Sequence, residues 1–148
     1  MINTNEYFLD IADAVAKQST CLDKAVGCVI VSQDNQIISC GYNGAPSKFP
    51  DCKSLGYCRK HKVNPGLCIA THAEINALIK AGDRAKGGKI FVSLEPCFEC
   101  AKAIINAKIT EVYFRRANDK SLIYKDTVRA LFKYVNIDYI HILKEEKC

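Results

Sequence analysis

The sequence lacks the features that mark membrane, exported or repetitive proteins. No apolar run among its 148 residues approaches the roughly 20 residues that a membrane-spanning helix needs. The N-terminal segment carries acidic residues early and lacks the basic and then apolar order of an export signal. Internal repeats, low-complexity tracts and linkers are also missing. We therefore expect a single domain over residues 1–148, without membrane contact, in the cytoplasm or in a host cytoplasm.

A strong net charge is missing as well. The chain has 21 Lys and Arg residues against 16 Asp and Glu residues, which gives a formal net charge of +5. This modest balance suits a substrate that carries phosphate, but it is too small and too dispersed to predict nucleic-acid binding. Lysines spread over a solvated surface would give the same balance, so both interpretations stay open.

Cysteine, by contrast, is abundant, with nine residues in the chain. In a reducing cytosol, metal ligation or burial explains so many cysteines better than disulfide bonds do. Their grouping favours metal, because Cys52, Cys58 and Cys68 lie near one another in the sequence, as do Cys97 and Cys100.

Hydrophobic periodicity predicts strands that alternate with helices. Such an alternation is typical of an α/β fold, and we expect a three-layer α/β/α domain with a central five-stranded mixed sheet. A β-hairpin would supply the antiparallel part of that sheet, whereas residues 44–70 hold glycines and prolines and predict a long irregular insertion. The expected helices cover residues 4–17, 72–81, 97–107 and 125–135, and the expected strands lie within 26–43 and at 89–94, 111–115 and 138–143.

Two short motifs at predicted helix starts carry the chemistry. His72, Cys97 and Cys100 offer one imidazole and two thiols, which are ligands that zinc prefers. Three protein ligands leave a fourth position for water, as in catalytic zinc sites. Glu74, two residues after His72, can lie beside that water without ligating the metal, and can move a proton from the water to a leaving amine.

Each motif alone has an ordinary explanation. Cys97 and Cys100 could be buried cysteines, His72 could be a capping histidine, and the zinc could be purely structural. Together, and in this order, His-x-Glu and Pro-Cys-x-x-Cys form the signature of zinc nucleobase deaminases. The sequence therefore favours a catalytic zinc at His72, Cys97 and Cys100.

On these motifs the chain resembles the cytidine deaminase-like superfamily and, within it, the deoxycytidylate (dCMP) deaminases. The resemblance covers roughly residues 5–143 and implies the cytidine deaminase-like fold and hydrolytic deamination of dCMP to dUMP, which supplies thymidylate synthesis. Water activated by zinc would attack carbon 4 of cytosine, with Glu74 as the acid and base, and Asn43 would contact the substrate. The resemblance to the dCMP deaminases rests on the segments STCLDKAVGCVIV, GYNGAPSKFPDC, THAEINA and EPCFECAKAIINAKITEVYF.

Three residues are candidates for substrate contact, and a fourth departs from the pattern of the resemblance. Asn43, followed by Gly44, can turn its amide towards a ligand, although an Asn-Gly pair also simply makes a turn. Lys24 is a candidate for phosphate binding, and Tyr124 either stacks on the base or is an ordinary packing or surface tyrosine. Glu95 lies directly before Pro96, where dCMP deaminases often carry a small or apolar residue. A glutamate at this position resembles the tRNA adenosine deaminases instead.

A second, structural zinc is expected at the insertion, because a metal would keep such a segment ordered. The resemblance supports this, since bacterial and phage dCMP deaminases often hold a zinc near here. Four of five candidates would bind it, with Cys58 and His61 competing for one place; free or buried cysteines are the alternative. The five candidates are Cys21, Cys52, Cys58, His61 and Cys68.

The resemblance also implies partners and regulation. It implies a homo-oligomer, with a hexamer favoured. It also implies that dCTP activates the enzyme, that dTTP inhibits it, and that Mg²⁺ accompanies the effector nucleotide. The alternatives are a deaminase that also accepts dCTP, a tRNA adenosine deaminase, and a non-catalytic binding module held together by zinc.

Overall fold

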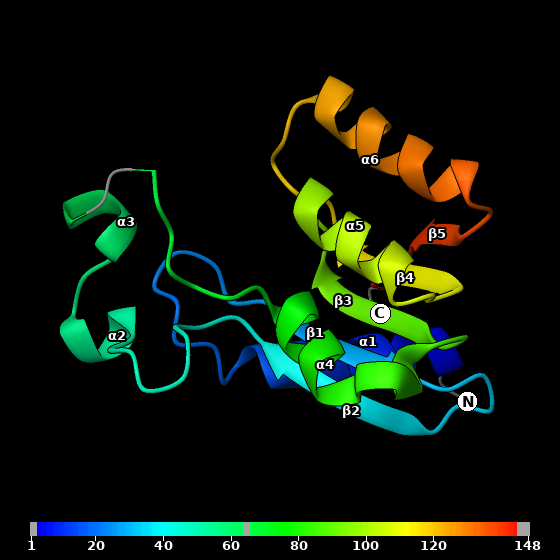
Figure 1. The fold of residues 1–148 in the computed structure, drawn as a ribbon, viewed down its shortest axis with the longest axis horizontal. Helices are drawn as coiled ribbons and strands as arrows, with labels where there is room; N and C mark the ends of the chain where they lie inside the picture. Colours follow the sequence, from blue (N-terminus) through cyan, green and yellow to red (C-terminus); the bar gives the residue numbers. More distant parts are fainter. Residues whose placement is uncertain (1–2, 64–65, 145–148) are drawn as a thin grey trace.

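The computed structural model describes residues 3–63 and 66–144, which form helices and strands (Figure 1). The helices are α1 (Thr4–Ala16), α2 (Cys52–Leu55), α3 (Arg59–Lys62), α4 (Ala73–Ala81), α5 (Phe98–Asn106) and α6 (Leu122–Tyr134), with the 3-10 turn η1 at Gly82–Ala85. The strands are β1 (Gly27–Val31), β2 (Ile37–Tyr42), β3 (Lys89–Leu94), β4 (Glu111–Arg116) and β5 (Asp138–His141).

The five strands form one mixed sheet in the order β2-β1-β3-β4-β5. Strand β1 pairs antiparallel with both β2 and β3, whereas β3, β4 and β5 run parallel. The predicted hairpin is β1 and β2, and its turn places Asn35 at a φ of 66°, a left-handed conformation that Asn tolerates well. The expected five-stranded mixed sheet is confirmed.

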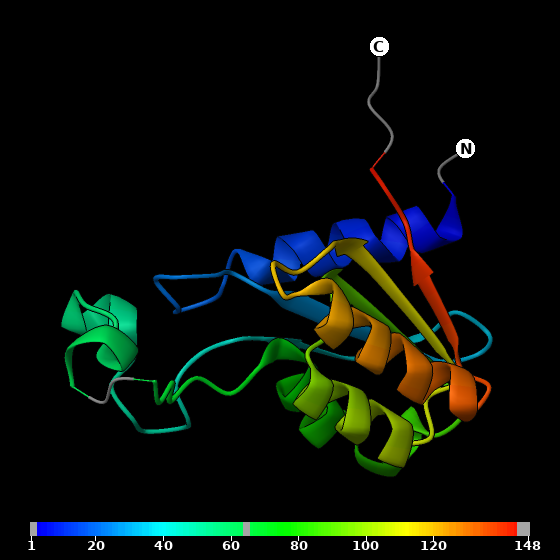
Figure 2. The same cartoon turned by 90° about the horizontal axis from the view of Figure 1, so that it is seen from above.

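Helices cover both faces of the sheet (Figure 2). Helix α1 packs Phe8 and Leu9 against Val29 and Phe91 on one face, and α4, α5 and α6 share a second core on the opposite face. Successive side chains of a strand point to opposite faces, so β1 contributes Val29 to the first core and Ile30 to the second. This arrangement confirms the three-layer α/β/α prediction.

An ion-pair network ties α1 to β4. The Arg115 side chain is 3% exposed, and its Nη1 donates to Asp10 Oδ1 at 2.8 Å and to Asp13 Oδ2 at 2.6 Å. The Nη2 atom of Arg115 donates to the Glu6 carbonyl oxygen at 3.3 Å. A buried guanidinium needs such partners, because an unpaired buried charge costs several kcal/mol.

The structure differs from the expectation at three places. Residues 44–70 were expected to be irregular, but they contain the one-turn helices α2 and α3, which protrude from the body of the domain (Figure 1). Helix α6 begins at Leu122 rather than near residue 125, because the Ser121 hydroxyl caps it by accepting the Tyr124 N–H at 3.2 Å. Strand β5 ends at His141 rather than at residue 143.

None of the helices in the described part of the chain has the length and apolar character that crossing a membrane requires.

Gly41 lets α4 lie directly on β2. A Cβ atom at this position would stand 2.5 Å from the Ala73 carbonyl oxygen and 2.6 Å from the Ala77 nitrogen. Both neighbours are backbone atoms of α4, so they cannot move aside by a rotamer change. The Ser39 hydroxyl donates to the Ala77 carbonyl oxygen at 2.8 Å and holds the helix at this close distance.

We expect the Gly41→Ala variant to lower the free energy of unfolding by about 1–3 kcal/mol, because the methyl group pushes α4 outward. The measurement is urea denaturation. The Cys40→Ala variant is the control, since Cys40 is exposed on the same strand. Equal stability of Gly41→Ala and Cys40→Ala would contradict the proposed close contact.

Candidate metal centre and substrate pocket

The starts of α4 and α5 are held by neighbouring strand ends. His72 is the N-cap residue of α4, and Cys97 is the N-cap residue of α5, with Glu95 and Pro96 between it and the end of β3. Thr71 and Gly44 exchange backbone hydrogen bonds of 2.8 and 3.2 Å, which tie the start of α4 to the end of β2. Asn76 reinforces this contact, because its Nδ2 donates to the Tyr42 carbonyl oxygen at 2.8 Å.

The predicted ligands converge at this point. The ligand atoms of His72, Cys97 and Cys100 lie within 4.8 Å of one another. His72 Nδ1 is 3.3 Å from Cys100 Sγ and 3.5 Å from Cys97 Sγ. A tetrahedral zinc with bonds of about 2.0 Å to nitrogen and 2.3 Å to sulfur would hold these atoms about 3.5 Å apart. The donor set and its spacing therefore fit zinc.

The two thiols differ in acidity when no metal neutralises them. A hydrogen bond from Cys100, together with one from His72, lowers the pKa of Cys97 to about 4. The same interaction with Cys97, followed by burial, raises the pKa of Cys100 far above its usual value. The hydrogen bond with Cys97 also raises the pKa of His72. These interactions favour the thiolate form of Cys97 over that of Cys100, and metal binding displaces the protons that the ligands still hold.

Glu74 is placed to carry a proton. It lies in the first turn of α4, is 4% exposed and lines the same cavity as His72 and Cys97. Burial raises the pKa of its carboxyl group above the usual value. A carboxyl group whose pKa is raised holds a proton more strongly, which suits it to accept and then donate a proton during a reaction.

The raised pKa of Glu74 predicts how the stability of the metal-free protein depends on pH. An unfolded glutamate ionises near about pH 4.3, while the folded protein holds the Glu74 proton to higher pH. Its contribution to stability is therefore present at acid pH and is lost as the pH rises through the folded pKa. We expect wild type to lose stability relative to Glu74→Gln as the pH rises above about 4. Denaturation of both proteins in a chelator measures this, and a pH-independent difference would contradict it.

The cavity beside the metal ligands has a volume of ≈ 230 Å³. Asn43 lies in its wall and is 7% exposed, but most of its amide is already engaged. Its Oδ1 accepts from Ser19 Oγ at 2.6 Å and from Val26 N at 2.9 Å, and its Nδ2 donates to the Lys24 carbonyl oxygen at 2.7 Å. Asn43 thus holds the loop before β1, and its contact with substrate stays a prediction.

The two other substrate candidates have different surroundings. Lys24 lines the cavity, and its Nζ lies 3.1 Å from Asp119 Oδ1 in an exposed ion pair. Tyr124 packs against the core, and its hydroxyl accepts the N–H of Phe98 at 2.7 Å. These contacts agree with the packing role that the sequence left open for Tyr124. Substrate contacts by Lys24 and Tyr124 stay predictions.

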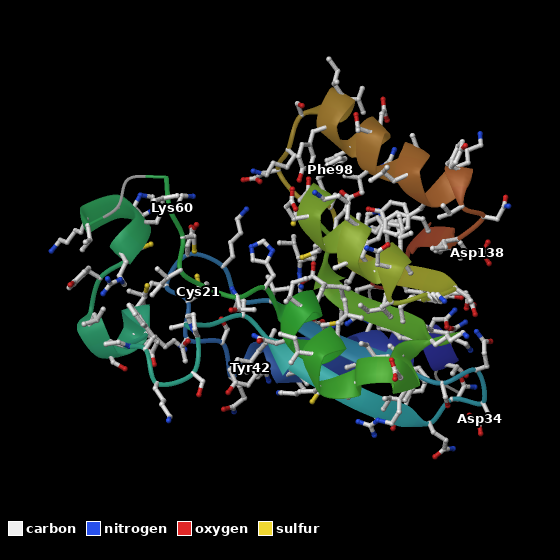
Figure 3. All side chains as sticks on the ribbon, viewed as in Figure 1. Cys21, Asp34, Tyr42, Lys60, Phe98 and Asp138 are labelled. Carbon is white, nitrogen blue, oxygen red and sulfur yellow. The ribbon has the colours of Figure 1, made fainter. Side chains whose placement is uncertain are left out.

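The candidates for the second zinc are only partly gathered. Cys21, Cys52, Cys58 and Cys68 line the cavity, whereas His61 does not. Figure 3 shows Cys21 between the protruding insertion and the body of the domain. Among the described residues, the catalytic trio alone forms a group of three or more potential ligands within 4.8 Å of one another. The second zinc site therefore stays a prediction.

Sequence reasoning missed the function of Glu95. Its side chain is 4% exposed, its Oε2 accepts from the Tyr139 hydroxyl at 2.8 Å and its Oε1 accepts from Asn118 N at 3.3 Å. Burial, and then the Glu95 carboxylate, raise the pKa of Tyr139. Glu95 thereby fixes the loop after β4, which brings Asn118, Asp119 and Lys120 to the cavity. The unusual glutamate before Pro96 was the available signal, but its partner is 44 residues away.

Comparison with known proteins agrees with this site. Residues 2–116 match the family described as the cytidine and deoxycytidylate deaminase zinc-binding region. A deoxycytidylate deaminase of Pongo abelii is 40% identical over 112 residues, which are 74% of this chain and 62% of that protein. The Mus musculus deoxycytidylate deaminase is 37% identical over 139 residues, which are 90% of this chain and 76% of that protein.

A solved structure extends the comparison to the fold. The apo dCMP deaminase of the cyanophage S-TIM5 superposes with a TM-score of 0.71 at 27% identity, over 93% of this chain and 96% of that one. The curated relatives include longer proteins, so the chain spans only 62% of the Pongo abelii relative. The matched residues include His72, Glu74, Cys97 and Cys100. The chain belongs to the cytidine and deoxycytidylate deaminase zinc-binding family.

Proposed function

We propose that this protein is a zinc-dependent hydrolase that deaminates dCMP to dUMP. The observation that carries this proposal is the convergence of His72, Cys97 and Cys100 beside the buried carboxyl group of Glu74 in one cavity. Relatives named deoxycytidylate deaminase, at 37–40% identity, support the choice of substrate. Release of dUMP would supply the substrate for thymidylate synthesis.

The residues of the site divide the reaction between them. Zinc bound at the trio would supply a Lewis acid that makes water nucleophilic at neutral pH. The Glu74 carboxylate accepts a proton from that water, delivers it to the ring nitrogen of cytosine and then assists the loss of ammonia. The buried position of Glu74 favours both steps, because burial raises the pKa of its carboxyl group.

Ammonia release from dCMP, dCTP, deoxycytidine and CMP tests the proposal. We expect the highest kcat/KM for dCMP. Equal turnover of dCMP and dCTP would indicate the dual-substrate alternative, and equal turnover of deoxycytidine would remove the role of the phosphate. Ammonia release from tRNA alone would favour a tRNA adenosine deaminase. Zinc binding without any turnover would leave a binding module.

We also propose that the insertion holds a second, structural zinc. Four cysteines that line the cavity, Cys21, Cys52, Cys58 and Cys68, support a set of four sulfurs in preference to His61. A closed tetrahedral site of this kind would order a segment that has few apolar anchors. Metal analysis should return two zinc ions per chain. A value of one zinc per chain would refute the second site.

Regulation and assembly complete the proposal. The resemblance of the GYNG segment to dCMP deaminases supports activation by dCTP with Mg²⁺, inhibition by dTTP, and a hexamer. Assays of dCMP turnover with each nucleotide, and the mass of the protein in solution, test these points. None of the described cysteines forms a disulfide bond, which supports a cytoplasmic location.

A further inference from the structure

The positive charge of the chain is concentrated on the insertion, which corrects the expectation that it is dispersed. Residues 44–70 carry five Lys and Arg residues and one acidic residue, Asp51, whereas the whole chain has a net charge of +5. Figure 1 shows this segment as a protrusion beside the body of the domain, and Figure 3 places Lys60 on it. The basic residues are Lys48, Lys53, Arg59, Lys60 and Lys62.

Two of these cations, Arg59 and Lys60, belong to the wall of the cavity that also contains His72 and Cys97. No carboxylate in the described part of the chain forms an ion pair with either side chain. The Nε atom of Arg59 is buried and has no hydrogen-bond partner. The guanidinium carbon of Arg59 lies 5.1 Å from the centre of the Phe49 ring, which restricts the orientation of the group.

The other two basic residues of the cavity wall, Lys24 and Lys120, are less available to an anion. Lys24 is paired with Asp119, whose carboxylate lies 3.1 Å from the Lys24 ammonium group. Asp23 and Asp119 also line the cavity, and each directly precedes one of these lysines in the chain. Their negative charges would repel a phosphate there, so an anionic group is more favourable beside Arg59 and Lys60.

We infer that Arg59, with Lys60, binds the phosphate of the nucleotide substrate and makes the protein select a nucleotide over a nucleoside. This inference rests on the proposed function. Guanidinium is the side-chain group best shaped for phosphate, because its planar N–H groups donate two parallel hydrogen bonds to phosphate oxygens. With the base at the zinc and the phosphate at α3, the substrate would bridge the body of the domain and its insertion.

The test compares dCMP with deoxycytidine, which lacks the phosphate. In the Arg59→Met variant, the ratio of kcat/KM for dCMP to kcat/KM for deoxycytidine should fall at least about tenfold, the scale of a lost charge-assisted hydrogen bond. Lys62→Met is the matched control, because Lys62 lies on the same helix but contacts the Tyr57 ring instead of the cavity. Its ratio should equal that of wild type. An unchanged ratio in Arg59→Met would overturn the inference.

A binding measurement separates this inference from the proposed function. Calorimetry on zinc-loaded Glu74→Gln protein gives the affinity for dCMP. The double variant Glu74→Gln/Arg59→Met should bind dCMP at least about tenfold more weakly. If wild type released no ammonia from dCMP, the proposed function would fail while this affinity still tested the phosphate site. Equal affinity of the single and the double variant for dCMP would overturn the inference that Arg59 binds the phosphate. Zinc content and the unfolding midpoint verify that each variant is folded, and Lys60→Met repeats the test at the neighbouring position.

Discussion

Replacement of Glu74 by Gln is expected to lower kcat for dCMP by at least about a hundredfold, the usual scale of general acid–base catalysis. Glutamine fills the same volume but neither accepts nor delivers a proton. Because Glu74 is not among the three converging ligands, the zinc content should remain that of wild type. Ammonia release and metal analysis on the same preparation measure both quantities.

Glu99→Gln is the matched control for this change. Glu99 also lies in the first turn of a helix, α5, but it is exposed and its carboxylate pairs with Lys102 at 2.8 Å. Its replacement should leave kcat within about twofold, since an exposed pair of this kind contributes at most about 1 kcal/mol to stability. A Glu74→Gln enzyme with the turnover of Glu99→Gln would exclude Glu74 as the proton carrier.

Replacement of Cys100 by Ala is expected to remove one zinc per chain and to reduce turnover of dCMP to background. Cys100 is buried and supplies one of the two sulfurs of the trio. Two remaining protein ligands cannot form a catalytic zinc site, which uses three. Since Lewis-acid activation of water is then lost, we expect a decrease in kcat of more than about a hundredfold.

The control for this variant is Cys40→Ala, because Cys40 is exposed on β2 and is not part of the trio. It should keep the zinc content and the turnover of wild type. Far-UV circular dichroism of Cys100→Ala tests whether the fold persists without the metal. Full zinc occupancy in a folded Cys100→Ala protein would contradict the assignment of Cys100 as a ligand.

Local patterns made the fold and the trio predictable from the sequence. Residues 89–94 and 111–115 are rich in β-branched and aromatic residues and form the strands β3 and β4. His72 and Cys97 stand at the boundaries where helical periodicity begins, and they are the N-cap residues of α4 and α5. The short spacing from Cys97 to Cys100 placed both sulfurs on one turn. Such features depend on neighbours in the chain, which a single sequence shows directly.

Long-range hydrogen bonds were not predictable in the same way. The contact of Asn43 with substrate stays a prediction, and the hydrogen bonds of its amide to Ser19 and to the loop before β1 were not foreseen. Glu95 was seen only as an unusual residue, because its bond to Tyr139 depends on β5 lying next to β4. The cavity position of Arg59 likewise depends on how the insertion folds back. Sequence spacing carries no information on these pairings.

Anomalous X-ray scattering at the zinc edge, from crystals of zinc-loaded Glu74→Gln protein with dCMP, tests the central claim most directly. We predict a peak about 2.0 Å from His72 Nδ1 and about 2.3 Å from Cys97 Sγ and Cys100 Sγ. The residue 74 side chain should face the fourth position together with carbon 4 of the cytosine ring. A peak absent from this trio, or a side chain at 74 turned away from the ring, would contradict the account.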